Sequence, residues 1–238
     1  MPIALVTGGN QGIGLATVRG LAKAGVTTWL AARRPDAGEA AVALLAAEGL
    51  TVRPITLDVT DARSIAAAVA RIDALDILVN NAAMDDHSDG VSSTVSVDAM
   101  RRCYEVNVFG VHAVTNAFLP LLRRSAQGRI VNVSSQVGSL ALVAGGRGMP
   151  LAAYKSSKAA LNMLTIELAR ELKDTAIKVN SIAPGFTPTN LNAHLTPPPG
   201  VKLQTIDEGA VASVKYALIG PDGPSGGFFD ANDERVPW

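Results

Sequence analysis

The chain alternates short apolar runs with longer segments of helical periodicity, and this alternation constrains its fold more than any other feature. Runs rich in Val, Ile and Leu without polar alternation are typical of parallel strands covered on both faces. Because helical segments separate these runs, the sequence predicts an α/β fold with one doubly wound domain, a mostly parallel, seven-stranded sheet and helices on both faces. The predicted strands are IALVTG, TTWLAAR, TVRPITLDV, DILVNNAA, GRIVNVSS, IKVNSIAPG and GGFFD.

The predicted helices are bounded by residues that favour helix ends. Asp36 with Glu39, and Thr205 with Glu208, have the spacing of a capping box, and glycines favour left-handed helix ends. The helices are expected to end at Gly25 and Gly49, to begin at Thr60, and to span residues of about 96–124, 152–173 and 205–218.

The composition excludes several classes of function. The 238 residues suit one large α/β domain, and 21 Lys and Arg residues balance 21 Asp and Glu residues, which disfavours nucleic acid as a partner. No apolar run reaches the roughly 18 residues of a membrane span, and no targeting signal precedes the first strand. The single cysteine, Cys103, allows no internal disulfide, so we expect a cytoplasmic protein without a membrane partner. His87, His112 and His194 lack metal-ligand spacing, and no metal site is expected.

Glycines gather where the first predicted strand passes into the first helix. Gly8, Gly12 and Gly14 let the backbone approach a ligand, and a helix amino terminus favours negative charge. The natural occupant of such a turn is the diphosphate of a dinucleotide. The spacing is wider than in the G-x-G-x-x-G fingerprint, and glycines at a turn could also serve the structure alone. The turn by itself therefore leaves both interpretations open.

Further motifs follow the glycine turn and together carry a family resemblance. After TGGNQGIG at residues 7–14 come NNAA at 80–83, Asn107 in EVNVFG, Ser135 in IVNVSS, Tyr154-x-x-x-Lys158, and PGFTPT at 184–189. This order, over nearly the whole chain, resembles that of the short-chain dehydrogenases/reductases, and most of all their carbonyl-reductase type. The resemblance implies one NADP-binding Rossmann domain over residues 1–238.

Tyr154 and Lys158 lie one helical turn apart, which allows the ammonium group to stand near the phenol. A phenol has a pKa of about 10, and positive charge from Lys158 and from an oxidised nicotinamide is expected to lower it. Tyr154 is then the general acid in carbonyl reduction and the base in the reverse reaction. Ser135 is expected to hydrogen-bond the same carbonyl oxygen. The resemblance implies that Asn107 supports a bound water linking Lys158 to solvent.

The resemblance also implies which residues contact the cofactor. The second predicted strand ends at Ala32 without a carboxylate, whereas Arg33 and Arg34 can bind a 2′-phosphate through charge-assisted hydrogen bonds. NADPH/NADP+ is therefore expected in preference to NADH. The predicted cofactor-binding residues are Gly8, Asn10, Gln11, Gly12, Ile13, Gly14, Arg33, Arg34, Asp58, Val59, Asn80, Ala82, Tyr154, Lys158, Pro184, Gly185, Thr187 and Thr189. Among these, the resemblance implies that Asp58 and Val59 contact the adenine, that Asn80 and Ala82 line its ribose, and that Pro184, Gly185 and Thr189 approach the nicotinamide.

The catalytic set predicts an NADPH-dependent carbonyl reductase or alcohol dehydrogenase that acts on a ketone, aldehyde or quinone of modest size. Residues 186–204 are expected to form a mobile substrate lid, because they hold few large apolar anchors and a Pro-Pro-Pro-Gly run. Two alternatives stay open: a dinucleotide-binding sensor or scaffold without catalysis, and a reductase of carbon–carbon double bonds on the same fold. The joint presence of Asn107, Ser135, Tyr154 and Lys158 argues against the first. The sequence leaves self-association open.

Overall fold

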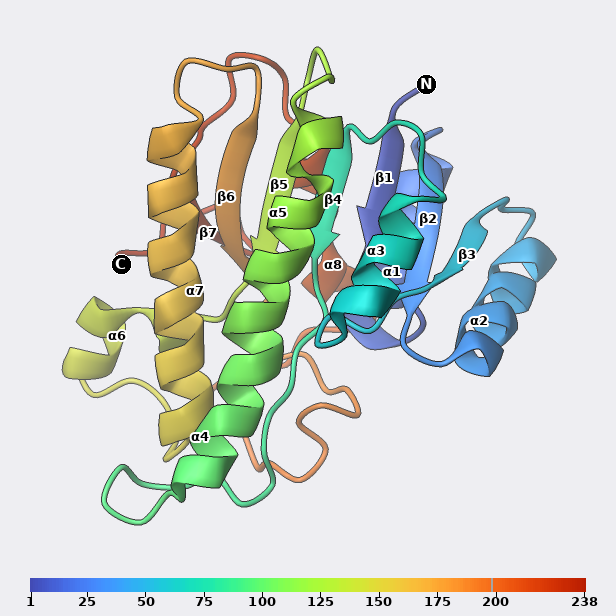
Figure 1. Cartoon of the computed structure of the whole chain (residues 1–238). Coiled ribbons are helices and arrows are strands. Elements are labelled where there is room, and N and C mark those ends of the chain that lie inside the picture. The colour runs from blue at the N-terminus through green and yellow to red at the C-terminus, as the bar shows by residue number, and fades with distance from the viewer. Residues whose placement is uncertain (198) are drawn as a thin grey trace.

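The computed structural model describes residues 1–197 and 199–238, and its centre is a sheet of seven strands in the order β3-β2-β1-β4-β5-β6-β7 (Figure 1). The neighbouring strands pair in parallel throughout this sheet. The order reverses beside β1, where a doubly wound fold opens its ligand crevice at the carboxyl ends of the strands. The predicted fold class is therefore confirmed. The strands are β1 (Ile3–Val6), β2 (Thr27–Ala32), β3 (Arg53–Thr56), β4 (Ile77–Asn80), β5 (Arg129–Val133), β6 (Lys178–Ala183) and β7 (Gly227–Asp230).

Helices connect the strands and cover both faces of the sheet. They are α1 (Gly12–Lys23), α2 (Pro35–Ala47), α3 (Ala62–Val69), α4 (Val97–Tyr104), the π-helix η1 (Glu105–Gly110), α5 (Val111–Leu122), the 3-10 helix η2 (Gln136–Gly138), α6 (Leu140–Ala144), α7 (Ala152–Glu171) and α8 (Ile206–Ala217). In Figure 1, α3, α5 and α7 lie in front of the sheet, and α1 and α8 lie behind it. Gly25 and Gly49 follow α1 and α2 with positive φ, as predicted.

Alternate strand residues pack against opposite layers of helices. In β1, Leu5 belongs to the core cluster that also holds Phe118 of α5, whereas Ala4 and Val6 belong to the cluster that holds Leu21 of α1. Both faces of the strand are therefore buried. This double burial is the physical reason for the apolar, non-alternating strands in the sequence.

The predicted helix over residues 96–124 is not one regular helix, because the π-turn η1 joins α4 to α5. A Cβ at Gly110 would lie 3.0 Å from the carbonyl oxygen of Val59, so glycine permits η1 to approach the loop after β3 closely. Wide turns of this kind occur often at functional sites. This one contains Asn107.

The two predicted capping boxes differ in outcome. The box at Thr205 and Glu208 is confirmed, since Thr205 Oγ1 accepts a hydrogen bond from the Glu208 amide at 3.1 Å. The box at Asp36 and Glu39 is wrong, because α2 begins at Pro35 and its N-cap residue makes no side-chain cap bond. The fixed φ of proline and its missing amide suit the first helical position.

Two long segments extend past the carboxyl ends of the strands, at the end of the molecule away from the N-terminus (Figure 1). They are residues 81–96 and 184–205, and residue 198 of the second, which falls in the predicted lid, lies outside the described residues. Residues 136–144, for which the sequence predicts a loop, form η2 and α6. Within the described chain, no helix is long and apolar enough to cross a membrane.

Candidate active site

The glycine turn between β1 and α1 has the geometry of a cradle for an anion. Gly8 and Gly12 have φ of +61° and +53°, a backbone conformation that favours glycine. A Cβ at Gly14 would lie 2.2 Å from the carbonyl oxygen of Gly8, so a side chain there would push the turn apart. Gln11 is the N-cap of α1 and makes no side-chain cap bond, which leaves first-turn amides for a ligand. Asn10 and Ile13 belong to the same turn, and the arrangement fits the diphosphate of a dinucleotide.

Asn81 fixes this glycine turn from the end of β4. Its Nδ2 donates to the carbonyl oxygens of Thr7 at 2.9 Å and Gly8 at 3.1 Å, and Thr7 Oγ1 accepts from the amides of Asn81 and Ala82, each at 3.0 Å. Asn81 is not among the site residues predicted from the sequence. The turn brings two carbonyl oxygens together, and a side-chain amide can donate one hydrogen to each of them. The available signal in the sequence was therefore an asparagine next to the predicted site residue Asn80.

Asn80, predicted to line the adenine ribose, directs its side chain elsewhere. The residue is 2% exposed, and Nδ2 donates to Thr115 Oγ1 at 3.0 Å and to Asn132 Oδ1 at 2.9 Å. The amide thus joins β4 to β5 and α5 inside the fold. A ribose contact from Asn80 would have to come from its backbone.

Arg33 and Arg34 differ in their surroundings. Both follow the buried Ala32 at the end of β2 and are exposed. Arg34 lies 3.3 Å from the carboxylate of Asp36, whereas Arg33 forms no ion pair with any residue that the structure describes. The guanidinium of Arg33 is therefore the freer of the two to bind a phosphate.

The predicted adenine contacts lie in the turn after β3. Asp58 Oδ1 accepts hydrogen bonds from the amide of Thr60 at 2.9 Å and from its hydroxyl at 2.7 Å. Val59 is buried and packs against η1 at Gly110. The turn is therefore held in place from both sides, and one carboxylate oxygen of Asp58 is tied to the turn itself.

Lys158 stands inside the fold with its ammonium group at the carboxyl edge of the sheet. The side chain is 2% exposed, and Nζ donates to the carbonyl oxygen of Val133, the last residue of β5, at 2.9 Å. Nζ lies 5.5 Å from the centroid of the Tyr154 ring. Burial lowers the pKa of Lys158 to about 8, so the side chain remains mostly charged at neutral pH.

Tyr154 is half-buried at the start of α7. Burial raises the pKa of its phenol above the ordinary value, and the negative charge of Asp85 raises it further. The sequence predicts that Lys158 lowers the pKa of Tyr154, but the groups of the protein itself raise it. The phenol is held protonated near neutral pH, which is the form that a proton donor needs.

Ser135 is the second residue after β5 and the N-cap of the short helix η2. Its Oγ accepts from the Val137 amide at 3.4 Å, and the residue is half-buried. A Cβ at Gly138 would lie 2.8 Å from Lys158 Cβ, so glycine lets η2 rest directly on α7. Asn162 Nδ2 donates to the Gly138 carbonyl oxygen at 3.2 Å and fastens this contact. Ser135 therefore starts a segment that is docked beside Lys158.

Asn107 is fully buried in η1 and bonds to two neighbouring segments. Its Oδ1 accepts from the Met84 amide and its Nδ2 donates to the Met84 carbonyl oxygen, both at 2.8 Å. Nδ2 also donates to Ser157 Oγ at 3.0 Å, and that hydroxyl donates to the Tyr154 carbonyl oxygen at 2.7 Å. The amide thus connects the segment after β4 to the first turn of α7.

Asp89 is a further site residue that sequence reasoning missed. Its carboxylate accepts from the amides of Ala153 at 3.0 Å and Tyr154 at 2.9 Å, in the first turn of α7. A carboxylate at this position accepts hydrogen bonds from free backbone amides, and its negative charge interacts favourably with the positive end of the helix dipole. Asp89 lies 65 residues before Tyr154, so no local capping pattern could reveal it.

Residues 186–204 meet the site on two sides. Thr189 Cγ2 would lie 3.2 Å from a Cβ on Gly12, and Asn190 Nδ2 donates to Gln11 Oε1 at 3.1 Å, beside the glycine turn. At the other side His194 Nε2 lies 3.6 Å from Asp85 Oδ2.

The other predicted cofactor-binding residues of this part of the chain lie where the segment begins. Thr187 is 2% exposed, and its Oγ1 donates to the Pro184 carbonyl oxygen at 3.3 Å. Gly185 has a φ of +75°, and a Cβ there would lie 2.9 Å from Gln204 Cγ. Thr187 thus faces into its own turn rather than outward.

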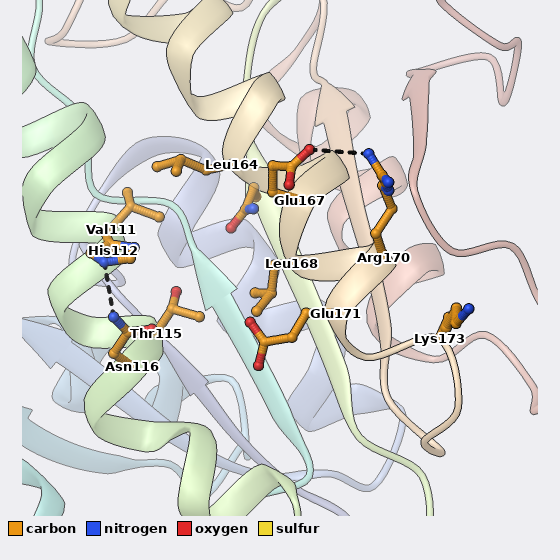
Figure 2. A pocket seen from close by; sticks show the side chains of 11 residues that line it. Val111, His112, Thr115, Asn116, Leu164, Glu167, Leu168, Arg170, Glu171 and Lys173 are labelled. Carbon is orange, nitrogen blue, oxygen red and sulfur yellow. Dashed lines mark hydrogen bonds and ion pairs between the residues drawn. The ribbon is translucent and has the colours of Figure 1, made fainter.

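A cavity of about 450 Å³ lies between α5 and α7, apart from these residues (Figure 2). Its lining includes His112 and Asn116 of α5, which bond to each other, and Glu167 and Arg170 of α7, which form an ion pair. It includes no predicted catalytic or cofactor residue. Across the described residues, no group of three or more His, Cys, Asp or Glu side chains could hold a metal ion.

Comparisons with known proteins give a consistent result. A family model described as short chain dehydrogenase matches residues 2–199. Short-chain dehydrogenase anuI of Penicillium roqueforti is 36% identical over 233 residues, with 92% of this chain and 89% of that protein covered. Carbonyl reductase (NADPH) 1 of Mus musculus is 32% identical, with 100% of this chain and 98% of that protein covered. The crystal structure of NADPH-bound carbonyl reductase from chicken fatty liver has a TM-score of 0.85 and 27% identity, with 100% of both chains covered.

The fold and the glycine turn place the protein among the doubly wound oxidoreductases with a dinucleotide crevice. Within that class, the chain belongs to the short-chain dehydrogenase family. The resemblance stated from the sequence motifs is therefore confirmed.

Proposed function

We propose that the chain is an NADPH-dependent carbonyl reductase or alcohol dehydrogenase that transfers hydride between NADPH and a ketone, aldehyde or quinone of modest size. The observation that carries this proposal is the pairing of a neutral phenol, Tyr154, with the buried ammonium group of Lys158 at the carboxyl edge of the sheet. Relatives named as carbonyl reductases, from Mus musculus and chicken, support it. We place the enzyme in the cytoplasm, with a small carbonyl or alcohol compound as its partner.

The proton steps follow from the residues at the site. Tyr154 donates its phenolic proton to the carbonyl oxygen during reduction and accepts a proton during oxidation. Ser135 donates a hydrogen bond to the same oxygen and stabilises the charge that develops there. Lys158 would bind the ribose hydroxyls, and its positive charge would favour the phenolate only in combination with that of an oxidised nicotinamide, because the protein's own groups raise the pKa of Tyr154. Asn107 holds the segment that carries Met84 and supports a water through which the proton returns.

The cofactor is held from several elements. The free amides after Gly12 bind the diphosphate, and Arg33 binds the 2′-phosphate. When bound, NADPH supplies the hydride. Pro184, Gly185 and the segment that follows lie on the nicotinamide side, and residues 186–204 act as a lid that excludes water.

A spectrophotometric screen of NADPH oxidation against varied carbonyl compounds tests the proposal. The parent protein should reduce at least one ketone, aldehyde or quinone, and Tyr154→Phe should lose most of the turnover while it keeps its affinity for NADPH, because only the reacting hydroxyl is removed. A Tyr154→Phe variant with the parent rate would contradict the role of Tyr154. Reduction of alkenes alone would favour a carbon–carbon double-bond reductase, and cofactor binding with no turnover would favour a sensor or scaffold.

A further inference from the structure

Asp85, in the segment after β4, is a buried carboxylate with an unused oxygen. Its side chain is 3% exposed, and among the residues that the structure describes Oδ1 has no hydrogen-bond partner. The other oxygen, Oδ2, lies 3.6 Å from His194 Nε2, a distance longer than a hydrogen bond. A buried polar atom without a partner is costly, so its presence calls for a reason.

The segment that carries Asp85 is fastened on both sides, so the carboxylate cannot simply turn to solvent. Asn107 holds the backbone of Met84 at both its amide and its carbonyl group. Asp86 accepts hydrogen bonds from Arg102 Nε and from Ser88. These bonds fix the residues directly before and after Asp85.

On one side of Asp85, Asn107 links the neighbouring residue Met84 to Ser157 of α7, and on the other side Asp85 Oδ2 lies 3.6 Å from His194 Nε2. The negative charge of Asp85 helps to raise the pKa of the Tyr154 phenol. On the lid side, the ring of His194 packs against that of His87 with centroids 4.1 Å apart. Burial raises the pKa of Asp85 to about 6, opposed by the two histidines and assisted by Asp86 and Asp89, so the carboxylate is mostly ionised at neutral pH.

We propose that Asp85 is a substrate-binding residue whose free oxygen accepts a hydrogen bond from a hydroxyl or protonated amine on the carbonyl substrate. The inference rests on the proposed function and names its substrate class: carbonyl compounds that carry a hydrogen-bond donor near the carbonyl group. A substrate with such a donor satisfies Oδ1, whereas an analogue without one leaves a buried carboxylate unpaired. Sites built to bond a polar group reject such analogues strongly.

Three ketones of similar size test the inference: propiophenone, 2-hydroxyacetophenone and 2-aminoacetophenone, which carry a methyl, a hydroxyl and an amine at the same position. The parent enzyme should prefer one or both donor ketones over propiophenone by about tenfold or more in kcat/KM, since a charge-assisted hydrogen bond is worth roughly that factor. Asp85→Leu should bring this ratio close to one. Asp85→Asn should lose the preference for the amine and keep part of the preference for the hydroxyl, which separates a cationic donor from a neutral one.

A matched control separates recognition from a general effect of removing a carboxylate. Asp98→Asn removes an exposed carboxylate of α4 and its ion pair with Arg101, and should keep the parent ratio. A role of Asp85 in structure alone would change the rates with all three ketones by the same factor. Equal preference in the parent and Asp85→Leu, or loss of the preference in Asp98→Asn, would overturn the inference.

Binding measurements keep this result distinct from failure of the proposed function. If none of the ketones is reduced, calorimetry of the same three compounds with the NADP+-loaded protein still compares the parent with Asp85→Leu. Tighter binding of a donor ketone in the parent, lost in Asp85→Leu, supports the inference. Equal dissociation constants for the three ketones in the parent contradict it.

Discussion

The two arginines after β2 illustrate how neighbouring residues with the same side chain can differ in their surroundings. Arg33 is without an ion pair in the described structure, whereas Arg34 lies beside Asp36. Arg33→Ala should therefore raise the Michaelis constant for NADPH roughly tenfold to a hundredfold, which corresponds to about 1.5–3 kcal/mol, and leave that for NADH almost unchanged. Steady-state kinetics with both cofactors measure this, with Arg34→Ala as the matched control of smaller effect. Equal loss with NADPH and NADH would contradict a phosphate contact.

The buried carboxyl of Asp85 makes stability depend on pH. Burial raises its pKa from 3.8 to about 6, so folding favours the protonated form. This stabilisation is complete below a pH of about 4, declines as pH rises and is lost above about 6. Asp85→Asn is therefore expected to stabilise the fold by up to about 3 kcal/mol more at neutral pH than at a pH of about 4. Urea unfolding at both pH values measures the difference, and an identical effect at both would refute it.

At the scale of an element, the first turn of α7 depends on a carboxylate from another segment. Asp89→Ala removes the cap from the amides of Ala153 and Tyr154, which should cost about 1 kcal/mol of stability and lower kcat more than the affinity for NADPH. Asp89→Asn should recover part of both losses, because asparagine also caps helices. Asp61, which caps α3 through the Arg63 amide at 2.9 Å, provides the control. If Asp61→Ala lowered kcat as much as Asp89→Ala, the effect would be one of general stability.

The elements also show why the π-turn η1 lies where it does. The side-chain amide of Asn107 accepts a hydrogen bond from the Met84 amide and donates one to Ser157 Oγ. Gly110 allows the turn to approach the loop after β3. A regular helix through this region would place these groups at different angles. The wide turn therefore positions Asn107 and Gly110 for their contacts at the site.

At the scale of the whole molecule, residues 186–204 connect two regions that are distant in sequence, the glycine turn and the segment of Asp85. Because Asn190 and His194, which make these contacts from the lid, are exposed and the lid has few large apolar anchors, we expect it to open and close. Hydrogen exchange in residues 186–204 should slow when NADPH and substrate bind together. The amides of β5, which are buried in the sheet, serve as the internal control. Identical exchange with and without ligands would count against a mobile lid.

The sequence by itself determined the parallel sheet, the glycine turn and the family. These follow from local properties: apolar runs without alternation, glycines at a strand-to-helix turn, and Tyr154 and Lys158 one helical turn apart. Each of these patterns lies within a short stretch of the chain. They can be interpreted before any contact between distant segments is known.

Only the tertiary structure decided how distant residues complete the site. It assigned Asn81 to the glycine turn and Asn80 to the core, although the two are adjacent and identical. It also brought Asp89 to the amide of Tyr154 and left Asp85 buried beside the lid. The physical reason is that a hydrogen bond between segments depends on how each loop returns to the sheet. That path is set by packing of the whole chain and leaves no periodic signal in the residues concerned.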